Sequence, residues 1–267
     1  MNVFLYIIIF IMGTLFGSFY TLAVHRIPRK LDITHTHSFC PNCNHKLGFF
    51  ELIPVWSYIF LGGKCKECKQ KIRPRYIVLE ILSGITFVLI ALLSGLNANN
   101  IQIKLLVELA FIVLYLAAIF IIAGIDKESK KVEKSVLYYA LIVCVAYILY
   151  LCIMDYTSIY RYTMYLGAIS LFLVMDNVKL INHAKDDYDL SILILIMIMA
   201  VVTGEVTTIA TILFTAIVIL ELYIFNKINQ ARTKAKKEEK KILDNFPWAF
   251  YLGVSNVICL IIMMILI

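Results

Sequence analysis

Charged residues are scarce in this chain, and so is proline. Asp, Glu, Lys and Arg make up 16% of the 267 residues, whereas about 25% is usual in soluble globular proteins. Only 5 prolines occur, and four of them lie between residues 25 and 75. No internal repeat is visible, and low complexity is confined to the Lys/Glu run at 231–241. These absences exclude a soluble globular domain and a repeat array.

Apolar residues are correspondingly abundant: they make up 61% of the chain, and the mean hydropathy is +0.86. Apolar runs close to the roughly 20 residues that cross a bilayer recur along the whole length. We read eight spans, the sixth and seventh joined tightly at Gly204 and Glu205. The spans lie at 3–24, 77–95, 102–125, 136–154, 159–178, 190–204, 206–226 and 247–267. The predicted fold class is therefore all-α, a polytopic membrane helical bundle of about eight transmembrane helices.

Positive charge is distributed unevenly around these spans. With the N-terminus outside, 23 of the 25 Lys and Arg residues fall in the four inward segments, at 25–76, 126–135, 179–189 and 227–246. The positive-inside rule therefore predicts this orientation. The net charge of +7 then belongs to cytoplasmic loops that contact water or anionic membrane lipid, and it does not indicate nucleic-acid binding. The first run has no basic residue before it and exceeds a signal-peptide core, so we expect a retained helix.

Four of the seven cysteines lie in the polar segment 25–76, as two Cys-x-x-Cys pairs. The pairs are Cys40 with Cys43 and Cys65 with Cys68, and 21 residues separate them. This spacing is typical of a structural zinc site, in which four thiolates leave no open position for catalysis. Two disulfides or redox thiols are the alternative, but a reducing cytoplasm disfavours stable disulfides. We expect a small cytoplasmic loop that binds zinc through these four cysteines.

Several aspartates stand at the predicted cytoplasmic ends of spans. Asp126 ends the third span, Asp176 ends the fifth, and Asp186, Asp187 and Asp189 precede the sixth. Two carboxylates from different helices can share one proton, which is the requirement for aspartyl proteolysis. We expect Asp189 to be an N-cap, whereas a helix C-terminus disfavours the anion at Asp126 and so favours a functional role there. The neighbouring lysines leave an ordinary screened charge at Asp126 as the alternative.

Two features of the first two spans suggest local contacts. Gly13 and Gly17 form a small-xxx-small pair, which predicts close contact with another helix. Glu80 lies about one turn into the second span, where an ion pair with Arg75 or contact with a ligand would account for a carboxylate.

The order of these motifs resembles the type IV prepilin peptidase family, a group of aspartic membrane proteases. The stretches that carry the resemblance are "GSFYTLAVHRIPR" (17–29), "IPVWSYIFLGGKCKEC" (53–68), "IRPRYIVLE" (72–80), "IDKESKKVEKS" (125–135) and "FPWAFYLGVSNVICLI" (246–261). The resemblance implies a multi-pass protein of the bacterial cell membrane, with eight spans, the N-terminus outside and the active site facing the cytoplasm. It divides the chain into a first transmembrane helix (1–24), a cytoplasmic zinc-binding loop (25–76) and a transmembrane peptidase bundle (77–267).

The resemblance also implies the catalytic residues. Asp126 matches the family's first catalytic aspartate. The second normally follows Gly-x-Gly and precedes an aliphatic residue, Lys and Leu, and this chain lacks those glycines. The stretch "AKDDYDL" (184–190) aligns without a gap and makes Asp187 the second aspartate, with Asp186 and then Asp176 as alternatives. Without the glycines the backbone is less free, so substrate access or activity itself can differ from the family's.

The implied function is removal of the leader peptide from type IV prepilin or pseudopilin precursors by two aspartates. The family often N-methylates the new N-terminus with S-adenosylmethionine, although no glycine-rich methyl-donor fingerprint is visible here. A degenerate, non-catalytic scaffold that binds pilin-like proteins is the main alternative. A third possibility is a membrane protein in which the four cysteines bind zinc only to fold the loop and have no part in any processing of pilins.

Overall fold

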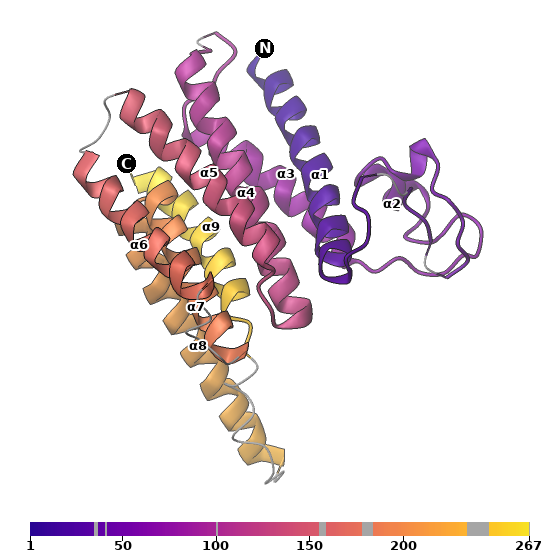
Figure 1. Cartoon of the computed structure of the whole chain (residues 1–267). Helices are drawn as coiled ribbons and strands as arrows, with labels where there is room; N and C mark the ends of the chain where they lie inside the picture. Colours follow the sequence, from indigo (N-terminus) through magenta and orange to yellow (C-terminus); the bar gives the residue numbers. More distant parts are fainter. Residues whose placement is uncertain are drawn as a thin grey trace. The chain divides into compact units, whose positions relative to one another are not determined.

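The computed structural model describes residues 1–34, 37–40, 42–99, 101–154, 159–177, 184–233 and 246–266. Apart from loops and turns, these residues form helices and two isolated antiparallel bridges. The helices are α1 (Asn2–Arg26), η1 (Ile27–Arg29), η2 (Phe49–Glu51), α2 (Trp56–Phe60), α3 (Arg75–Leu93), α4 (Ile103–Ser129), α5 (Lys134–Ile153), α6 (Ile159–Asn177), α7 (Ala184–Thr203), α8 (Glu205–Thr233) and α9 (Trp248–Leu266) (Figure 1). The predicted all-α class is confirmed.

Six helices in the described part of the chain are long and apolar enough to cross a membrane. They are α1, α3, α4, α5, residues Glu205–Phe225 of α8, and α9. Helix α7 contributes a shorter apolar stretch, Tyr188–Thr203, and α6 occupies the predicted fifth span. A long helix thus stands at each predicted span, and the prediction of a multi-pass helical membrane protein is confirmed.

Gly204 separates α7 from α8, as the predicted tight joint requires. Its φ is +88°, in the left-handed region that glycine adopts at little cost. A glycine in this conformation commonly ends a helix, because it turns the chain while the last carbonyls still find partners. Helix α8 begins directly afterwards at Glu205.

The chain divides into two compact units, Met1–Val113 and Leu114–Ile267. In the first unit, α1 packs along α3 through small residues (Figure 1). A Cβ added to Gly13 would lie 2.8 Å from the Cα of Gly84, and one added to Gly17 would lie 2.9 Å from the backbone of α3. The two helices therefore approach closely enough that only glycine fits, which confirms the contact predicted for this pair.

In the second unit a buried asparagine joins four helices. Asn256 of α9 is fully buried, and its Oδ1 accepts a 2.7 Å hydrogen bond from the hydroxyl of Tyr115 on α4. Its amide donates to the hydroxyls of Thr203 in α7, at 3.3 Å, and Thr211 in α8, at 3.2 Å. Polar side chains bonded across helices hold membrane bundles together. This polar node fixes α4, α7, α8 and α9 to one another.

Candidate functional site

The four cysteines of the 25–76 segment come together in space. Their Sγ atoms all lie within 4.8 Å of one another, with 3.8 Å between Cys40 and Cys68 and 3.9 Å between Cys43 and Cys65. Zn–S bonds of about 2.3 Å in a tetrahedron place sulfurs about 3.8 Å apart. The predicted tetrad is therefore confirmed as a cluster that can hold a metal ion, and its dimensions fit zinc.

The two Cys-x-x-Cys pairs are built from the same turn, used twice. The N–H of Cys40 and the N–H of Cys65 each donate, at 2.9 Å, to the carbonyl five residues further on. Asn44 and Lys69, each four residues after the first cysteine of its pair, have φ values of 56° and 58°. An antiparallel bridge flanks each turn. The sequence shows no repeat here because matching backbone conformation does not require matching side chains.

Hydrogen-bond donors favour the thiolate form of two of the four cysteines. The backbone N–H of Gln70, together with the side-chain amide of Asn42, lowers the pKa of Cys68 to about 6. The backbone N–H groups of Asn42 and Cys43 lower the pKa of Cys40 below its usual value. Despite a hydrogen bond from the backbone of His45, desolvation and the neighbouring cysteines raise the pKa of Cys43 to about 11. Thiolates are the form that binds a metal ion, so the turns favour binding through Cys40 and Cys68.

Glu51 closes the first half of the loop onto the first cysteine turn. Its Oε2 accepts a 2.7 Å hydrogen bond from the N–H of Gly48 and lies 3.0 Å from Nε2 of His45. The Gly48 N–H, helped by His45, holds the pKa of Glu51 below its usual value. The residue thus ties η2 to the turn that carries Cys40 and Cys43.

Arg26 fastens the loop to the end of α1. The side chain is only 7% exposed, and its guanidinium donates to the carbonyl oxygens of Asp32, at 2.8 Å, and His37, at 3.4 Å. A buried guanidinium has many donors to satisfy, and these carbonyls satisfy part of them. The chain after α1 therefore folds back on the helix end.

Glu80 fastens the other side of the loop to α3. The residue is buried, and its Oε2 accepts a 2.7 Å hydrogen bond from the N–H of Val55. Val55 has φ +64° and ψ −54°, and the N–H of Trp56 donates to the carbonyl of Pro54 at 2.6 Å. This is a γ-turn of the rare positive-φ form, which is strained for a β-branched residue. A hydrogen bond to the loop backbone thus accounts for the carboxylate in the second span. From the sequence, an ion pair with Arg75 or contact with a ligand is expected there.

Asp126 is the buried carboxylate of the second unit. It lies in the last turn of α4 with no solvent exposure. Its Oδ2 accepts a 3.0 Å hydrogen bond from the N–H of Phe250, in the first turn of α9. The N-terminus of a helix attracts negative charge, so α9 compensates for the unfavourable end of α4. Lys127 lies with Nζ 4.5 Å from the centroid of the Phe250 ring.

Tyr188 of α7 supplies the second hydrogen bond to Asp126. Its hydroxyl donates to Oδ1 of Asp126 at 2.9 Å and accepts from the N–H of Trp248 at 2.9 Å. One carboxylate therefore joins α4, α7 and α9. Sequence reasoning missed this residue, although a tyrosine next to a candidate aspartate at a span boundary was the available signal.

The other aspartates fall on two helices. Asp186 and Asp187 lie within α7, next to Tyr188 in sequence, and Asp176 lies in the last turn of α6. The side chains of these three lie outside the described residues. The expectation that Asp189 caps the sixth span is wrong, because α7 already runs from Ala184 and Asp189 is an exposed residue inside it. Tertiary packing extends the helix beyond the apolar run.

Comparisons with known proteins find one family model and several curated relatives. Residues 11–94 match the model of the bacterial Peptidase A24 N-terminal domain family. The chain is 33% identical over 134 residues to the prepilin leader peptidase/N-methyltransferase of Bacillus subtilis, covering 50% of each chain. It is 30% identical over 128 residues to that of Klebsiella pneumoniae, covering 46% of this chain and 52% of the relative. No solved structure matches significantly.

A third relative matches over a shorter stretch. The prepilin leader peptidase/N-methyltransferase of Vibrio cholerae is 34% identical over 87 residues, 29% of this chain and 34% of the relative. The chain thus spans about a third to a half of the length of these curated relatives. The resemblance to prepilin peptidases is confirmed. The family-model match contains the cysteine cluster and Glu80 and ends before Asp126.

Proposed function

We propose that the chain is a membrane peptidase that removes the leader from prepilin- or pseudopilin-like precursors, with Asp126 and Asp187 as its two carboxylates. The observation that carries the proposal is the buried carboxylate of Asp126, bonded to the residue that directly follows Asp187. A carboxylate with no solvent exposure in a membrane helix is costly, and such groups are commonly functional. The similarity to prepilin leader peptidase/N-methyltransferases supports the substrate class.

The proposed chemistry needs both aspartates. One carboxylate takes a proton from water as the water oxygen attacks the scissile carbonyl carbon, and the other protonates the carbonyl oxygen. Collapse of the resulting diol breaks the C–N bond, and a proton passes to the leaving amine. Tyr188 and the start of α9 hold Asp126 in place for this step. The charge pattern supports an active site at the cytoplasmic face of the bacterial cell membrane, with the N-terminus outside.

The experiment uses the full chain in lipid vesicles with a pilin-like precursor that carries a short basic leader. Wild type is expected to shorten the precursor, as measured by mass, and Asp126→Asn is expected to leave it intact. Asparagine retains the size and much of the hydrogen bonding of the aspartate but cannot exchange a proton. Cleavage by Asp126→Asn at the wild-type rate would rule out the aspartyl mechanism.

The second aspartate is assigned by three further variants in the same assay. Asp187→Asn is expected to abolish cleavage, while Asp186→Asn and Asp176→Asn are expected to retain it. Loss of activity in Asp186→Asn or Asp176→Asn alone would move the second carboxylate to that position.

We also assign a structural zinc ion to Cys40, Cys43, Cys65 and Cys68, because the distances between their sulfur atoms fit a zinc site. Zinc bound there would hold the two turns of the loop together.

Methylation of the new N-terminus from S-adenosylmethionine belongs to the same proposal, because the relatives' names include N-methyltransferase. It predicts a gain of one methyl group on the cleaved product when S-adenosylmethionine is supplied.

A non-catalytic scaffold for pilin-like proteins is the second candidate. Two observations favour it: α7 is helical through 184–190, where the family has two glycines, and protein groups already occupy both oxygens of Asp126. In that case the carboxylate is a structural tie between helices. A scaffold would bind the precursor equally well in wild type and Asp126→Asn and cleave it in neither, which the same vesicles measure.

A further inference from the structure

The loop between α1 and α3 exposes a set of large apolar side chains. Phe49, Phe50 and Phe60 are 77%, 80% and 79% exposed. Phe49 and Phe50 contact each other, and Trp56 stacks on Phe60. The large apolar side chains exposed between residues 49 and 60, here called the apolar surface of the loop, are Phe49, Phe50, Leu52, Trp56, Ile59 and Phe60. Exposed large apolar side chains gathered in one short segment of this kind indicate an interaction site.

The segment that carries this apolar surface is also bonded to a membrane span. Val55, in its middle, donates its N–H to the buried Oε2 of Glu80 at 2.7 Å. Glu80 is the sixth residue of α3, which places it about 8 Å along the helix from Arg75 at 1.5 Å per residue. The strained turn at Val55 is thus bonded to the second turn of α3, a helix long and apolar enough to cross a membrane.

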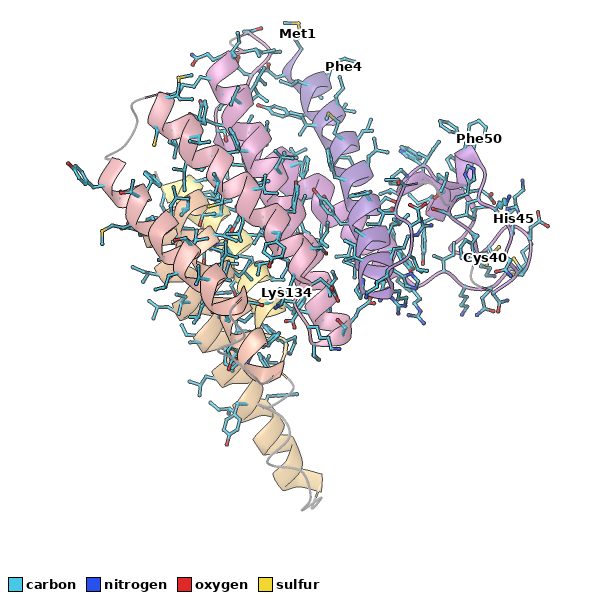
Figure 2. The ribbon with its side chains drawn as sticks, in the orientation of Figure 1. Met1, Phe4, Cys40, His45, Phe50 and Lys134 are labelled. Carbon is cyan, nitrogen blue, oxygen red and sulfur yellow. The ribbon has the colours of Figure 1, made fainter. Side chains whose placement is uncertain are left out.

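Basic residues follow directly on the apolar surface. The segment 64–73 exposes one acid, Glu67, and five basic side chains, namely Lys64, Lys66, Lys69, Lys71 and Arg73. Aromatic residues beside lysines and arginines are typical of segments that lie in the headgroup region of anionic bilayers. Figure 2 shows Phe50 at one end of the loop and Cys40 away from it.

We propose that the apolar surface of the loop inserts into the interfacial region of the bilayer, with segment 64–73 on the anionic headgroups. The loop is then a membrane-bound platform held at α3 by Glu80. The bond to the membrane helix α3 and the positive sign of the adjacent charge favour an anionic lipid surface over a protein partner. Insertion of the loop does not require that the chain cleave any substrate.

Tryptophan fluorescence tests the proposal directly, because the chain has only two tryptophans, Trp56 and Trp248. The full-length Trp248→Phe variant leaves Trp56 as the sole reporter. It is reconstituted in anionic vesicles whose lipids are brominated either near the headgroup or near the acyl-chain end. Headgroup-proximal bromine is expected to quench most of the Trp56 emission, and the deeper bromine less, as for a segment about 5–10 Å into the interface.

Absence of quenching by either lipid would overturn the proposal, as would Trp56 emission that responds only to an added pilin-like segment or to protein concentration. Replacing the anionic lipid with a zwitterionic one is expected to weaken quenching, and equal quenching would overturn the role given to segment 64–73. In the same background, Phe50→Ser/Phe60→Ser is expected to lose quenching and Phe50→Leu/Phe60→Leu to retain it. Metal content measured on each variant reports whether the loop is still folded.

Discussion

The hydroxyl of Tyr188 donates a 2.9 Å hydrogen bond to Oδ1 of Asp126, which links α7 to the last turn of α4. The same hydroxyl accepts from the N–H of Trp248, so one side chain also orders the start of α9. This contact brings the stretch that contains Asp187 to the buried aspartate.

Tyr188→Phe removes this hydroxyl and keeps the ring. Hydrogen bonds to charged groups contribute about 1.5–3 kcal/mol, so the cleavage rate constant is expected to fall about 10- to 100-fold. KM should change little, because the hydroxyl holds the carboxylate and not the substrate. Tyr138→Phe on α5, an exposed tyrosine, is the matched control and should cleave as wild type does. A wild-type rate for Tyr188→Phe would show that this hydrogen bond does not contribute to catalysis.

The cysteine cluster predicts one zinc ion per chain. Cys43→Ser should lose zinc, because a hydroxyl is a much poorer ligand than a thiolate. The measurement is elemental analysis of the purified full chain. Cys152→Ser, which changes a cysteine of α5 outside the cluster, should retain the ion. Equal zinc in both variants would show that the four cysteines do not form the metal site.

The close approach of α1 and α3 predicts a large effect from a single methyl group. In Gly13→Ala the new Cβ would lie 2.8 Å from the Cα of Gly84, so the helices must separate. Overpacking of this kind costs about 1–3 kcal/mol, which thermal unfolding in detergent should register as a lower Tm. Gly167→Ala on α6 has nothing within 4 Å of the added carbon and serves as the control. Equal Tm values would contradict the packing.

The polar node at Asn256 predicts a second stability effect. Asn256→Leu leaves the hydroxyls of Tyr115, Thr203 and Thr211 without their shared partner. Hydrogen bonds between membrane helices contribute about 0.6 kcal/mol each on average, so we expect a loss of about 1–3 kcal/mol in the free energy of unfolding. Denaturant unfolding in mixed micelles measures it. Val254→Leu, on an exposed part of α9, should be close to neutral, and equal stability of the two variants would refute the node.

Much of the fold follows from patterns local in sequence. Apolar runs near bilayer length gave the membrane helices, the spacing of Cys40, Cys43, Cys65 and Cys68 gave the cluster, and Gly13 gave a helix contact. Each of these signals depends on residue type and spacing alone, so each feature can be predicted from the sequence.

The remaining features depend on contacts between residues far apart in the chain. Tyr188 and Phe250, which bond to Asp126, are 62 and 124 residues away from it in the sequence, and no local pattern predicts such partners. Likewise, Val55 meets Glu80 only once the loop has folded back. The error at Asp189 has the same origin, because an apolar run marks the membrane-buried part of a helix and not its beginning.

The central claim is that Asp126 and Asp187 act together on a peptide bond. The most direct measurement is the cleavage rate of a pilin-like precursor by wild type, Asp126→Asn, Asp187→Asn and, as control, Asp189→Asn, an exposed residue of the same helix. Each of the first two substitutions should slow cleavage by about 10²-fold or more, while the control cleaves as wild type does. Wild-type cleavage by Asp126→Asn or by Asp187→Asn would contradict the account.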